Sequence, residues 1–343
     1  MNLDRQFAKS QHQKFIKRCL ELVPYRMKSL ETLKLLNVYF SLAELDLMNM
    51  LDKLPFSKSE FIEWIYQMML PVSEDAQTGF RPSSWFCSNE DDLSQYDQSH
   101  LTMTHCALLS LILLGDDLSR IDRRQLSNGL KLFQLNDGSF RPTVAEAEHD
   151  VRFIYSACVI AYCIDDWSGI DVDKCVQFLL RSFSYEGGFG QTPFNEAHGG
   201  ATYCAVASLY LMGRLHCLSV KQRERLIYWC IRKQVQGFRG RPDKDEDSCY
   251  SFWVCATLAI LDCKHFIDQN ANLNFLLDCQ DEVLGGFSKA PGTYSDPLHT
   301  HFSISALSIN ENFGLKPLHP AFDISLNVKH RLDDLHKKWN EVN

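Results

Sequence analysis

Long apolar stretches alternate with more polar ones along the chain. The apolar stretches, which contain few helix breakers, span residues 99–115, 150–164, 200–213, 248–261 and 297–310. Their composition predicts buried helices. The segments between them, such as residues 173–183 and 221–236, are amphipathic and predict helices with one exposed face. No sustained strand pattern occurs, so we expect an all-α protein built from pairs of one apolar and one amphipathic helix.

A glycine-containing turn followed by phenylalanine recurs between these helices. The phenylalanines are Phe80, Phe140, Phe189, Phe238 and Phe287. The last four are each 49 residues apart, whereas the first gap is 60 residues. Equal spacing over three consecutive gaps indicates a structural repeat, and glycine permits the sharp chain reversal at each turn. Five or six such pairs can close into a ring, an α/α toroid with a central cavity.

Composition narrows the class of protein. The chain has 343 residues, 45% of them hydrophobic, and a formal net charge of −8, which argues against an extended nucleic-acid surface. The longest apolar stretch, residues 106–114, is too short to span a bilayer. The 13 cysteines are scattered and form no CxxC pair, so we expect reduced thiols in a cytoplasmic protein. No linker rich in Pro, Gly or Ser divides the chain, and we expect one domain over residues 1–343.

Three metal-ligand types occur about one repeat apart. Asp247 and Cys249 begin one apolar stretch, and His299 lies near the start of the next. Zinc accepts carboxylate, thiolate and imidazole together, and catalytic zinc sites keep a fourth position open. Spacing alone leaves other interpretations open, because such a cysteine is usually a core residue, such an aspartate an N-cap, and such a histidine a surface or capping residue.

A basic group precedes the candidate ligands. His198, Arg241 and Lys244 are expected at the same end of adjacent repeats, and together with a tyrosine hydroxyl they would suit a diphosphate. A solvated charge cluster is the alternative, and from these residues alone it is the more frequent outcome.

Several longer motifs resemble those of the protein prenyltransferase β subunits. They are segments 196–200 (EAHGG), 240–244 (GRPDK) and 247–253 (DSCYSFW), together with His299-Thr300, and the resemblance extends from about residue 15 to residue 339. Segments 115–120 (GDDLSR), 150–155 (DVRFIY) and 165–171 (DDWSGID) resemble the geranylgeranyltransferase type I branch. The resemblance implies an α/α toroid, in agreement with the repeat.

The same resemblance implies a role for each candidate residue. The zinc ligands would be Asp247, Cys249 and His299. The diphosphate would be held by His198, Arg241, Lys244 and Tyr250, and the lipid channel lined by Arg152, Tyr155, Cys204 and Trp253. The last residue of the substrate's C-terminal CaaX box would contact Leu36, His100, Thr102 and Phe153.

Two positions distinguish branches of this family. Leu36 stands where farnesyltransferases have a tryptophan that closes the lipid channel, so a fourth isoprene unit should fit. Lys289 stands where the farnesyl and Rab enzymes carry an aspartate that helps to hold Mg²⁺. We therefore expect Lys289 to neutralise the leaving diphosphate directly, and we expect transfer not to require magnesium.

The activity implied is zinc-dependent transfer of a C20 geranylgeranyl group from geranylgeranyl diphosphate to the cysteine of CaaX proteins such as small GTPases. Zinc would favour the substrate thiolate, which attacks C1 of the diphosphate. The resemblance also implies an obligate α subunit. Alternatives within the family are the farnesyltransferase and Rab geranylgeranyltransferase β subunits.

Two alternatives lie outside the family. A terpene cyclase shares the architecture, and residues 134–140 (QLNDGSF) resemble the repeat motif of cyclases. Residues 163–166 (CIDD), however, have a cysteine in place of the first aspartate of the cyclase DxDD motif. The other alternative is a helical-repeat scaffold without enzymatic activity, which would need no metal ligands.

Overall fold

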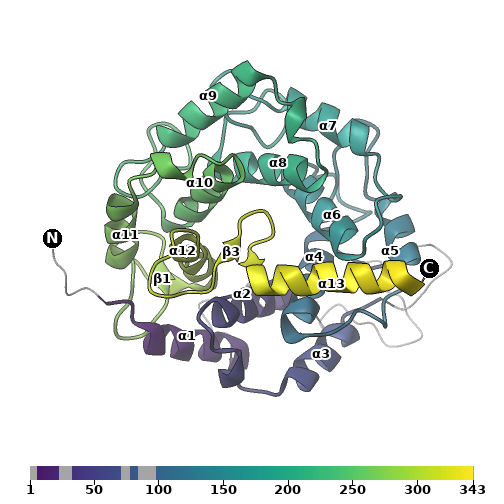
Figure 1. Ribbon diagram of the computed structural model, residues 1–343, viewed down its shortest axis with the longest axis horizontal. Helices are drawn as coiled ribbons and strands as arrows, with labels where there is room; N and C mark the ends of the chain where they lie inside the picture. Colours follow the sequence, from purple (N-terminus) through teal and green to yellow (C-terminus); the bar gives the residue numbers. More distant parts are fainter. Residues whose placement is uncertain (1–5, 23–32, 71–77, 84–97, 343) are drawn as a thin grey trace.

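The computed structural model describes residues 6–22, 33–70, 78–83 and 98–342, which form two concentric layers of helices (Figure 1). The inner helices are α2 (Lys34–Leu47), α4 (Leu101–Leu114), α6 (Val151–Cys163), α8 (Gly199–Leu211), α10 (Ser248–Ile260) and α12 (Pro297–Ile309). Each packs against the next, and α12 packs against α2, so the inner layer closes into a ring. The predicted α/α toroid is therefore confirmed.

The outer layer consists of helices that are mostly shorter and that alternate with the inner ones. They are α1 (Lys9–Glu21), α3 (Lys58–Gln67), α5 (Arg123–Leu130), α7 (Val172–Arg181), α9 (Val220–Ile231) and α11 (Gln269–Asp278). The amphipathic pattern suggested that the helix at α9 would continue to Gln236. It ends at Ile231 instead, because the chain then turns back so that Gln234 pairs with Phe238.

Short elements complete the chain. The 3₁₀ helices η2 (Leu51–Lys53), η4 (Leu215–Cys217) and η5 (Lys264–Phe266) each connect an inner helix to an outer one. Two antiparallel pairs of two-residue strands occur, β1 (Phe287–Ser288) with β2 (Ser295–Asp296) and β3 (Leu318–His319) with β4 (Ile324–Ser325). The last helix, α13 (Leu326–Val342), follows β4 and packs against α4 (Figure 1).

The repeating phenylalanine fixes each turn to the inner ring. All five phenylalanines are at most 1% exposed, and each pairs with a residue near the end of the preceding outer segment. In three repeats the phenylalanine backbone N–H also donates to a threonine hydroxyl on the following inner helix, at 2.9–3.0 Å. The 49-residue spacing thus reflects a repeated packing unit.

Polar caps begin five of the inner helices. The N-cap side chains of α4, α6, α8, α10 and α12 accept backbone N–H groups, and they are His100, Asp150, His198, Asp247 and Asp296. Because an outer helix intervenes between successive inner helices, the inner helices run in the same direction. Their caps and the positive ends of their dipoles therefore gather at one end of the ring, which favours an anion there.

The hairpin between β3 and β4 enters the ring and forms the floor of its interior (Figure 1). Tyrosine hydroxyls from three inner helices donate to backbone carbonyls of this hairpin: Tyr39 to Asp323 at 3.0 Å, Tyr155 to Ala321 at 3.1 Å and Tyr203 to Pro320 at 3.1 Å. These bonds satisfy both the buried hydroxyls and the buried carbonyls. The interior is therefore closed by main chain on the side opposite to the caps.

Candidate metal and isoprenoid site

Three potential metal ligands converge at the capped end of the ring. Asp247 is the N-cap of α10, Cys249 lies in the first turn of that helix, and His299 lies in the first turn of α12. One ligand atom from each residue lies within 4.8 Å of the others. Asp247 Oδ1 and His299 Nε2 are 3.3 Å apart. The structure thus brings together the three side chains that the spacing singles out.

A further carboxylate, Asp296, orients His299. Asp296 Oδ2 lies 2.6 Å from His299 Nδ1, and Asp296 Oδ1 accepts the His299 backbone N–H at 2.9 Å. The other ring nitrogen of His299, Nε2, therefore faces Asp247. Metal-ligating histidines are commonly held in this way, with one ring nitrogen bonded to a carboxylate and the other directed to the metal. Burial disfavours the imidazolium, but the hydrogen bonds to Asp247 and Asp296 outweigh it and raise the pKa of His299 to about 9.

The thiol of Cys249 completes a donor set that fits a metal ion. Cys249 is 3% exposed, and burial followed by the charge of Asp247 raises its pKa well above the usual range. A bound cation would reverse this effect, since it stabilises the thiolate. One thiolate, one imidazole and one carboxylate with a fourth position open form a donor set typical of catalytic zinc sites. These residues therefore fit a zinc ion.

Lys289 lies at the edge of this group. Its Nζ is 3.8 Å from Asp247 Oδ2, and 64% of its side chain is exposed. Its backbone carbonyl accepts the Ser248 N–H at 2.9 Å, which ties the loop after β1 to the start of α10. The ammonium group thus stands beside the candidate ligands and faces solvent.

The ring encloses a central cavity of about 450 Å³ next to these ligands. Trp253, Leu298 and Phe302, which follow or flank the ligands on α10 and α12, form part of its wall. Eight of the residues that the family resemblance implicates also line it: Leu36, Thr102, Arg152, Phe153, Tyr155, His198, Cys204 and Trp253. The cavity is mostly apolar and has the size of a small-molecule site.

His198 and Tyr250 form a polar pair near the caps. His198 Nδ1 accepts the backbone N–H groups of Gly200 and Ala201, so a neutral ring carries its proton on Nε2, which is 2.9 Å from the Tyr250 hydroxyl. Burial, and then the charge of Arg241, lower the pKa of His198, which favours this neutral form. Tyr250 then accepts from His198 and keeps its own O–H free to donate to an anion.

A close approach of glycine positions Tyr250. A Cβ at Gly240 would lie 2.0 Å from Cζ of Tyr250, so any larger residue there would displace the ring. Another wall residue, Arg152, is held by its own neighbours. Its guanidinium donates to both carboxylate oxygens of Asp150 and forms an ion pair with Glu148.

Of the four candidate diphosphate residues, only His198 is among those that line the cavity, whereas Tyr250, Arg241 and Lys244 are not. Arg241 pairs with Glu196 at 3.1 Å and lines a separate pocket of about 360 Å³ that also contains Lys233 and Arg239. Lys244 is exposed in the loop before α10. The structure therefore brings His198 and Tyr250 together and leaves Arg241 and Lys244 at the surface nearby.

The four candidate peptide contacts divide similarly. Leu36, Thr102 and Phe153 come from α2, α4 and α6 and line the cavity, where the Thr102 hydroxyl lies 3.2 Å from that of Ser156. His100 does not line it. Its Nδ1 accepts the Thr102 backbone N–H at 3.2 Å as the N-cap of α4.

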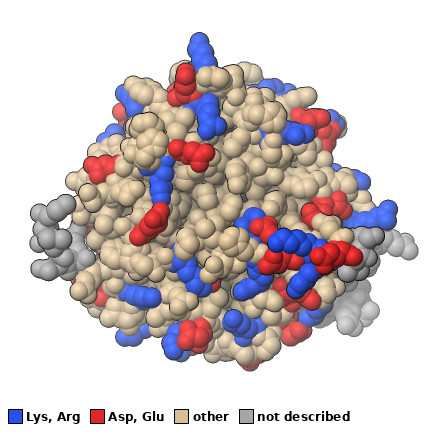
Figure 2. Space-filling model, in the orientation of Figure 1, with Lys and Arg blue, Asp and Glu red and all other residues tan. Residues whose placement is uncertain are grey.

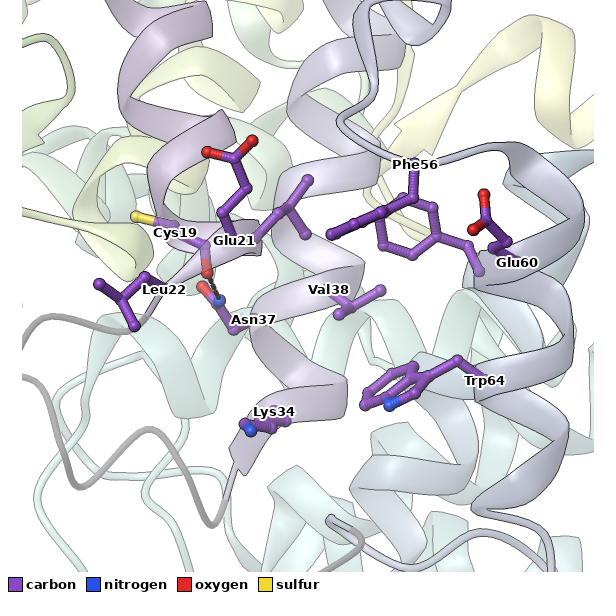
Figure 3. A pocket seen from close by; sticks show the side chains of 11 residues that line it. Cys19, Glu21, Leu22, Lys34, Asn37, Val38, Phe56, Glu60 and Trp64 are labelled. Carbon is purple, nitrogen blue, oxygen red and sulfur yellow. Dashed lines mark hydrogen bonds between the residues drawn. The ribbon is translucent and has the colours of Figure 1, made fainter.

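A second pocket lies between the outer helices α1 and α3 (Figure 3). It has a volume of about 420 Å³, and its lining includes Cys19, Asn37, Phe56 and Trp64. Burial raises the pKa of Cys19 to about 12, so this thiol is not activated. None of the candidate site residues lies in this hollow.

Neither the face of the molecule in Figure 2 nor the described cysteines outside the site supply a further candidate group for this site. Positive and negative side chains are interspersed over the face in Figure 2 and are densest along α13. Every cysteine that the structure describes is a free thiol. Among the described helices, none is long and apolar enough to cross a membrane.

Sequence reasoning missed the supporting carboxylates. Asp296 orients His299, Glu196 pairs with Arg241, and Asp150 holds Arg152. Asp296 could have been found from the sequence. Proline is frequent at the first position of a helix, so the residue directly before Pro297 is expected to be the N-cap, as Asp247 is in the preceding repeat.

Comparisons with known proteins agree with this geometry. The family model of the prenyltransferase alpha-alpha toroid domain matches residues 7–324. The chain is 36% identical to the geranylgeranyl transferase type-1 subunit beta of Arabidopsis thaliana, covering 93% of this chain and 89% of that protein. It is 35% identical to the same subunit of Dictyostelium discoideum, covering 91% and 93%.

A solved structure is similar over nearly the whole chain. It is that of Candida albicans protein geranylgeranyltransferase-I complexed with GGPP, with a TM-score of 0.88 and 27% identity over 96% of this chain and 99% of that chain. The chain therefore belongs to the prenyltransferase α/α toroid family and, within it, to the β subunits of type 1 geranylgeranyl transferases.

Proposed function

We propose that this chain is the catalytic β subunit of a zinc-dependent protein geranylgeranyltransferase type I. It would transfer the C20 group of geranylgeranyl diphosphate to the cysteine of C-terminal CaaX motifs, of the CaaL type, on small GTPases such as those of the Rho, Rac and Rap type. The observation that carries the proposal is the convergence of Asp247, Cys249 and His299 within 4.8 Å beside a mostly apolar cavity.

Asp247, Cys249 and His299 would hold the metal, which when bound would act as a Lewis acid that favours the thiolate of the substrate cysteine. Asp296 fixes the His299 ring so that Nε2 faces the other two ligands. Cys249 must lose its proton to serve as a ligand, and the same holds for His299 below a pH of about 9.

Donors around the caps would bind the diphosphate. Tyr250 can donate its hydroxyl proton to the diphosphate because it accepts a hydrogen bond from His198. The positive ends of the inner helix dipoles lie at the same end of the ring and would also favour an anion there. Arg241 and Lys244 lie close by on the loop before α10, and Lys289 stands beside Asp247. These cations would neutralise the charge that builds on the leaving diphosphate, and Lys289 would take the place of a magnesium ion.

The cavity wall would hold the isoprenoid. Tyr155, Cys204, Trp253 and Arg152 line the cavity and would contact the hydrocarbon, whose burial contributes about 0.8 kcal/mol per CH₂. Leu36, Thr102 and Phe153 would contact the last residue of the CaaX box, with His100 at its edge. The solved relative is described as complexed with GGPP, which supports this ligand.

An α subunit is expected to complete the enzyme, because the two relatives are each named as the beta subunit of a type-1 transferase, which implies a second subunit. The chain would contribute one toroid domain over residues 1–343. A terpene cyclase is disfavoured because Asp165 and Asp166 follow the C-terminal end of α6 and do not line the cavity.

The test uses the heterodimer obtained by co-expression with a family α subunit. Peptides ending in CaaL and CaaS are offered with C15 and C20 diphosphates, and we expect the C20 group to be transferred to CaaL in preference. Preferred transfer of the C15 group to CaaS would move the chain to the farnesyl branch.

Zinc is tested with a matched pair of cysteine variants on α10. Cys249→Ala should lose transfer and zinc while it still binds the lipid diphosphate. Cys255→Ala, which removes a fully buried thiol that is not a candidate ligand, should keep both. Full zinc content in a folded Cys249→Ala enzyme would overturn the assignment.

A further inference from the structure

Positive side chains gather around the separate pocket that Arg241 lines. This pocket, which we call the outer pocket, has a volume of about 360 Å³ and lies between the C-terminal end of α9 and the turn that leads to α10 (Figure 1). Four cations and two carboxylates line it, and they are Arg232, Lys233, Arg239, Arg241, Glu186 and Asp243. The outer pocket therefore has the size of a small-molecule site and a net charge of +2.

Lys233 is the unusual member of this group, because it is buried without a counter-ion. It is 6% exposed, and its ammonium lies over the ring of Trp229, 4.4 Å from the centroid. Its Nζ forms no hydrogen bond or ion pair with the residues that the structure describes, yet it is not one of their enclosed unpartnered atoms, so the group is reached from the pocket that Lys233 lines. Burial lowers the pKa of Lys233, and the negative charge of Glu186 opposes this effect. A buried ammonium of this kind is stabilised when an anion pairs with it.

The other cations of the outer pocket leave much of their charge uncompensated. Arg232 and Arg239 form no ion pair with any described residue, and Arg241 pairs with Glu196 at 3.1 Å but keeps 42% of its side chain exposed. Arg232 and Lys233 also complement the negative end of the α9 dipole, whereas Arg239 and Arg241 belong to the following turn and have no such role. The excess of positive charge therefore favours an anion that carries more than one negative charge.

Arg241 connects the outer pocket to the capped end of the central cavity. Burial and then the charge of Arg241 lower the pKa of His198, so Arg241 lies within electrostatic reach of this cavity residue. Arg241 lines the outer pocket together with Lys233 and Arg239. An anion released at the caps would therefore have a cation in reach that also borders the uncompensated charges of the outer pocket.

We propose that the outer pocket is a second anion site that binds inorganic diphosphate while the central cavity holds a prenyl diphosphate. The inference rests on the proposed function, because that reaction releases one inorganic diphosphate for each prenyl group that it transfers. Two linked phosphate groups carry several negative charges and acceptor oxygens, so they can contact more than one of the four cations at once. The outer pocket would thus hold the product away from the caps, where the next lipid diphosphate binds.

The experiment titrates inorganic diphosphate into the heterodimer loaded with labelled geranylgeranyl diphosphate, without peptide, so that no transfer occurs. Calorimetry should report one inorganic diphosphate bound per heterodimer while the labelled lipid stays bound. Zinc content is measured after the titration, because diphosphate also chelates metal ions. Inorganic phosphate has a single group for the same cations and should bind about tenfold more weakly. Displacement of the lipid, absence of a second site or equal affinity for phosphate would overturn the inference.

Charge variants show whether the outer pocket is the second site. Lys233→Met keeps an unbranched side chain over Trp229 but removes the charge, and it should raise the dissociation constant for inorganic diphosphate about tenfold. Lys233→Arg should largely keep the affinity. Glu186→Gln removes a negative charge from the same pocket and should tighten binding about threefold. A lysine that serves only the stability of the fold gives no reason for this gain.

Lys221→Met is the matched control, because it removes an exposed lysine at the start of α9, at the other end of the helix. It should leave the dissociation constant unchanged. If Lys233→Met does not fold, Arg239→Met replaces it, since it removes another unpaired cation of the outer pocket. An increase of less than about threefold in the folded variant, or the same increase in Lys221→Met, contradicts the inference.

Transfer from the C20 donor to a CaaL peptide is measured on the same preparations. Transfer by a heterodimer that has no second anion site would refute the inference alone. A heterodimer that binds the lipid diphosphate and inorganic diphosphate together but transfers nothing would refute the proposed function and leave the second anion site in place. Failure to bind either diphosphate would refute both.

Discussion

Replacing Asp296 by asparagine tests whether this carboxylate supports the metal site. Asp296 makes two contacts with His299, one from Oδ1 to the backbone N–H at 2.9 Å and one from Oδ2 to Nδ1 at 2.6 Å. In Asp296→Asn the amide oxygen can keep the first contact and so preserve the N-cap. The amide NH₂ then meets Nδ1, where it can only donate, which favours a proton on Nε2, the nitrogen that faces Asp247.

The expected loss of zinc affinity in Asp296→Asn follows from this mismatch between the amide NH₂ and the His299 ring. Loss of a carboxylate behind a metal-ligating histidine typically weakens metal affinity by about 10–100-fold, which corresponds to roughly 1.4–2.8 kcal/mol. Asparagine and aspartate are nearly equal as N-caps, so the stability of the metal-free protein should change little through capping. Affinity and stability are therefore expected to separate.

Zinc affinity is measured by competition with a chromogenic chelator on the purified heterodimer, and stability by thermal melting with and without zinc. Asp268→Asn is the control, since Asp268 caps α11 through Ala271 N–H at 3.0 Å and lies outside the site. Without zinc, both variants should melt alike well above pH 9, where His299 is neutral and its ion pair with Asp296 contributes nothing. Only Asp296→Asn should bind zinc more weakly. Equal zinc affinity in Asp296→Asn and wild type would show that this carboxylate does not orient His299.

Four further outcomes are expected. The raised pKa of His299, about 9, means that protonated His299 stabilises the metal-free protein below pH 6.5 and that this contribution is lost as the pH rises towards 9. The melting temperature of the metal-free protein should therefore fall between pH 6.5 and 9. Zinc affinity should rise over the same range, because zinc binds the deprotonated imidazole. Gly240→Ala should displace Tyr250 and raise the dissociation constant for the diphosphate about tenfold or more by calorimetry, with little effect on zinc content. Leu36→Trp should fill part of the cavity and shift kcat/KM towards the C15 donor by about 10–200-fold, and an unchanged C20-to-C15 ratio would count against a role in length selection. A magnesium titration at fixed zinc should leave the wild-type rate nearly flat, whereas Lys289→Asp should make it magnesium-dependent; a steep rise in the wild type would refute the role of Lys289.

Most of the fold could be predicted from the periodic alternation of apolar and polar stretches in the sequence. The apolar stretches correspond to α4, α6, α8, α10 and α12 within about two residues at each end, because a helix buried on all sides must be apolar throughout and its ends are marked by polar caps. The end of α9 was wrong because residues after Ile231 keep an amphipathic composition although they form a turn. Local composition does not record where the chain folds back to pair Gln234 with Phe238.

Site residues on the helix starts could be anticipated, since the repeat places equivalent positions together. The spacing alone left open whether Asp247 and His299 would meet, the family resemblance implied that they would, and in the structure their side chains are 3.3 Å apart. Residues outside the repeat could not be anticipated in this way. Asp323 belongs to the hairpin before α13, which has no counterpart in the other repeats, so its position against His301 depends on how the floor closes.

The helix caps explain why the candidate chemistry lies at one end of the ring. A side-chain N-cap needs a polar residue with an acceptor, and in the five capped inner helices it is a histidine or aspartate whose second polar atom can bind another group. Asp247 Oδ1 accepts the Cys249 N–H at 3.0 Å and also faces His299, and His198 caps α8 through Nδ1 while Nε2 reaches Tyr250. Asp296 caps α12 with one oxygen and holds His299 with the other. A repeat that needs such caps for its own stability therefore supplies, at every inner helix after α2, a rigidly placed functional group beside the positive end of a helix dipole. Under the proposed function, the caps would therefore place much of the metal and diphosphate site, and Arg241, Lys244 and Lys289 would join it from adjacent loops.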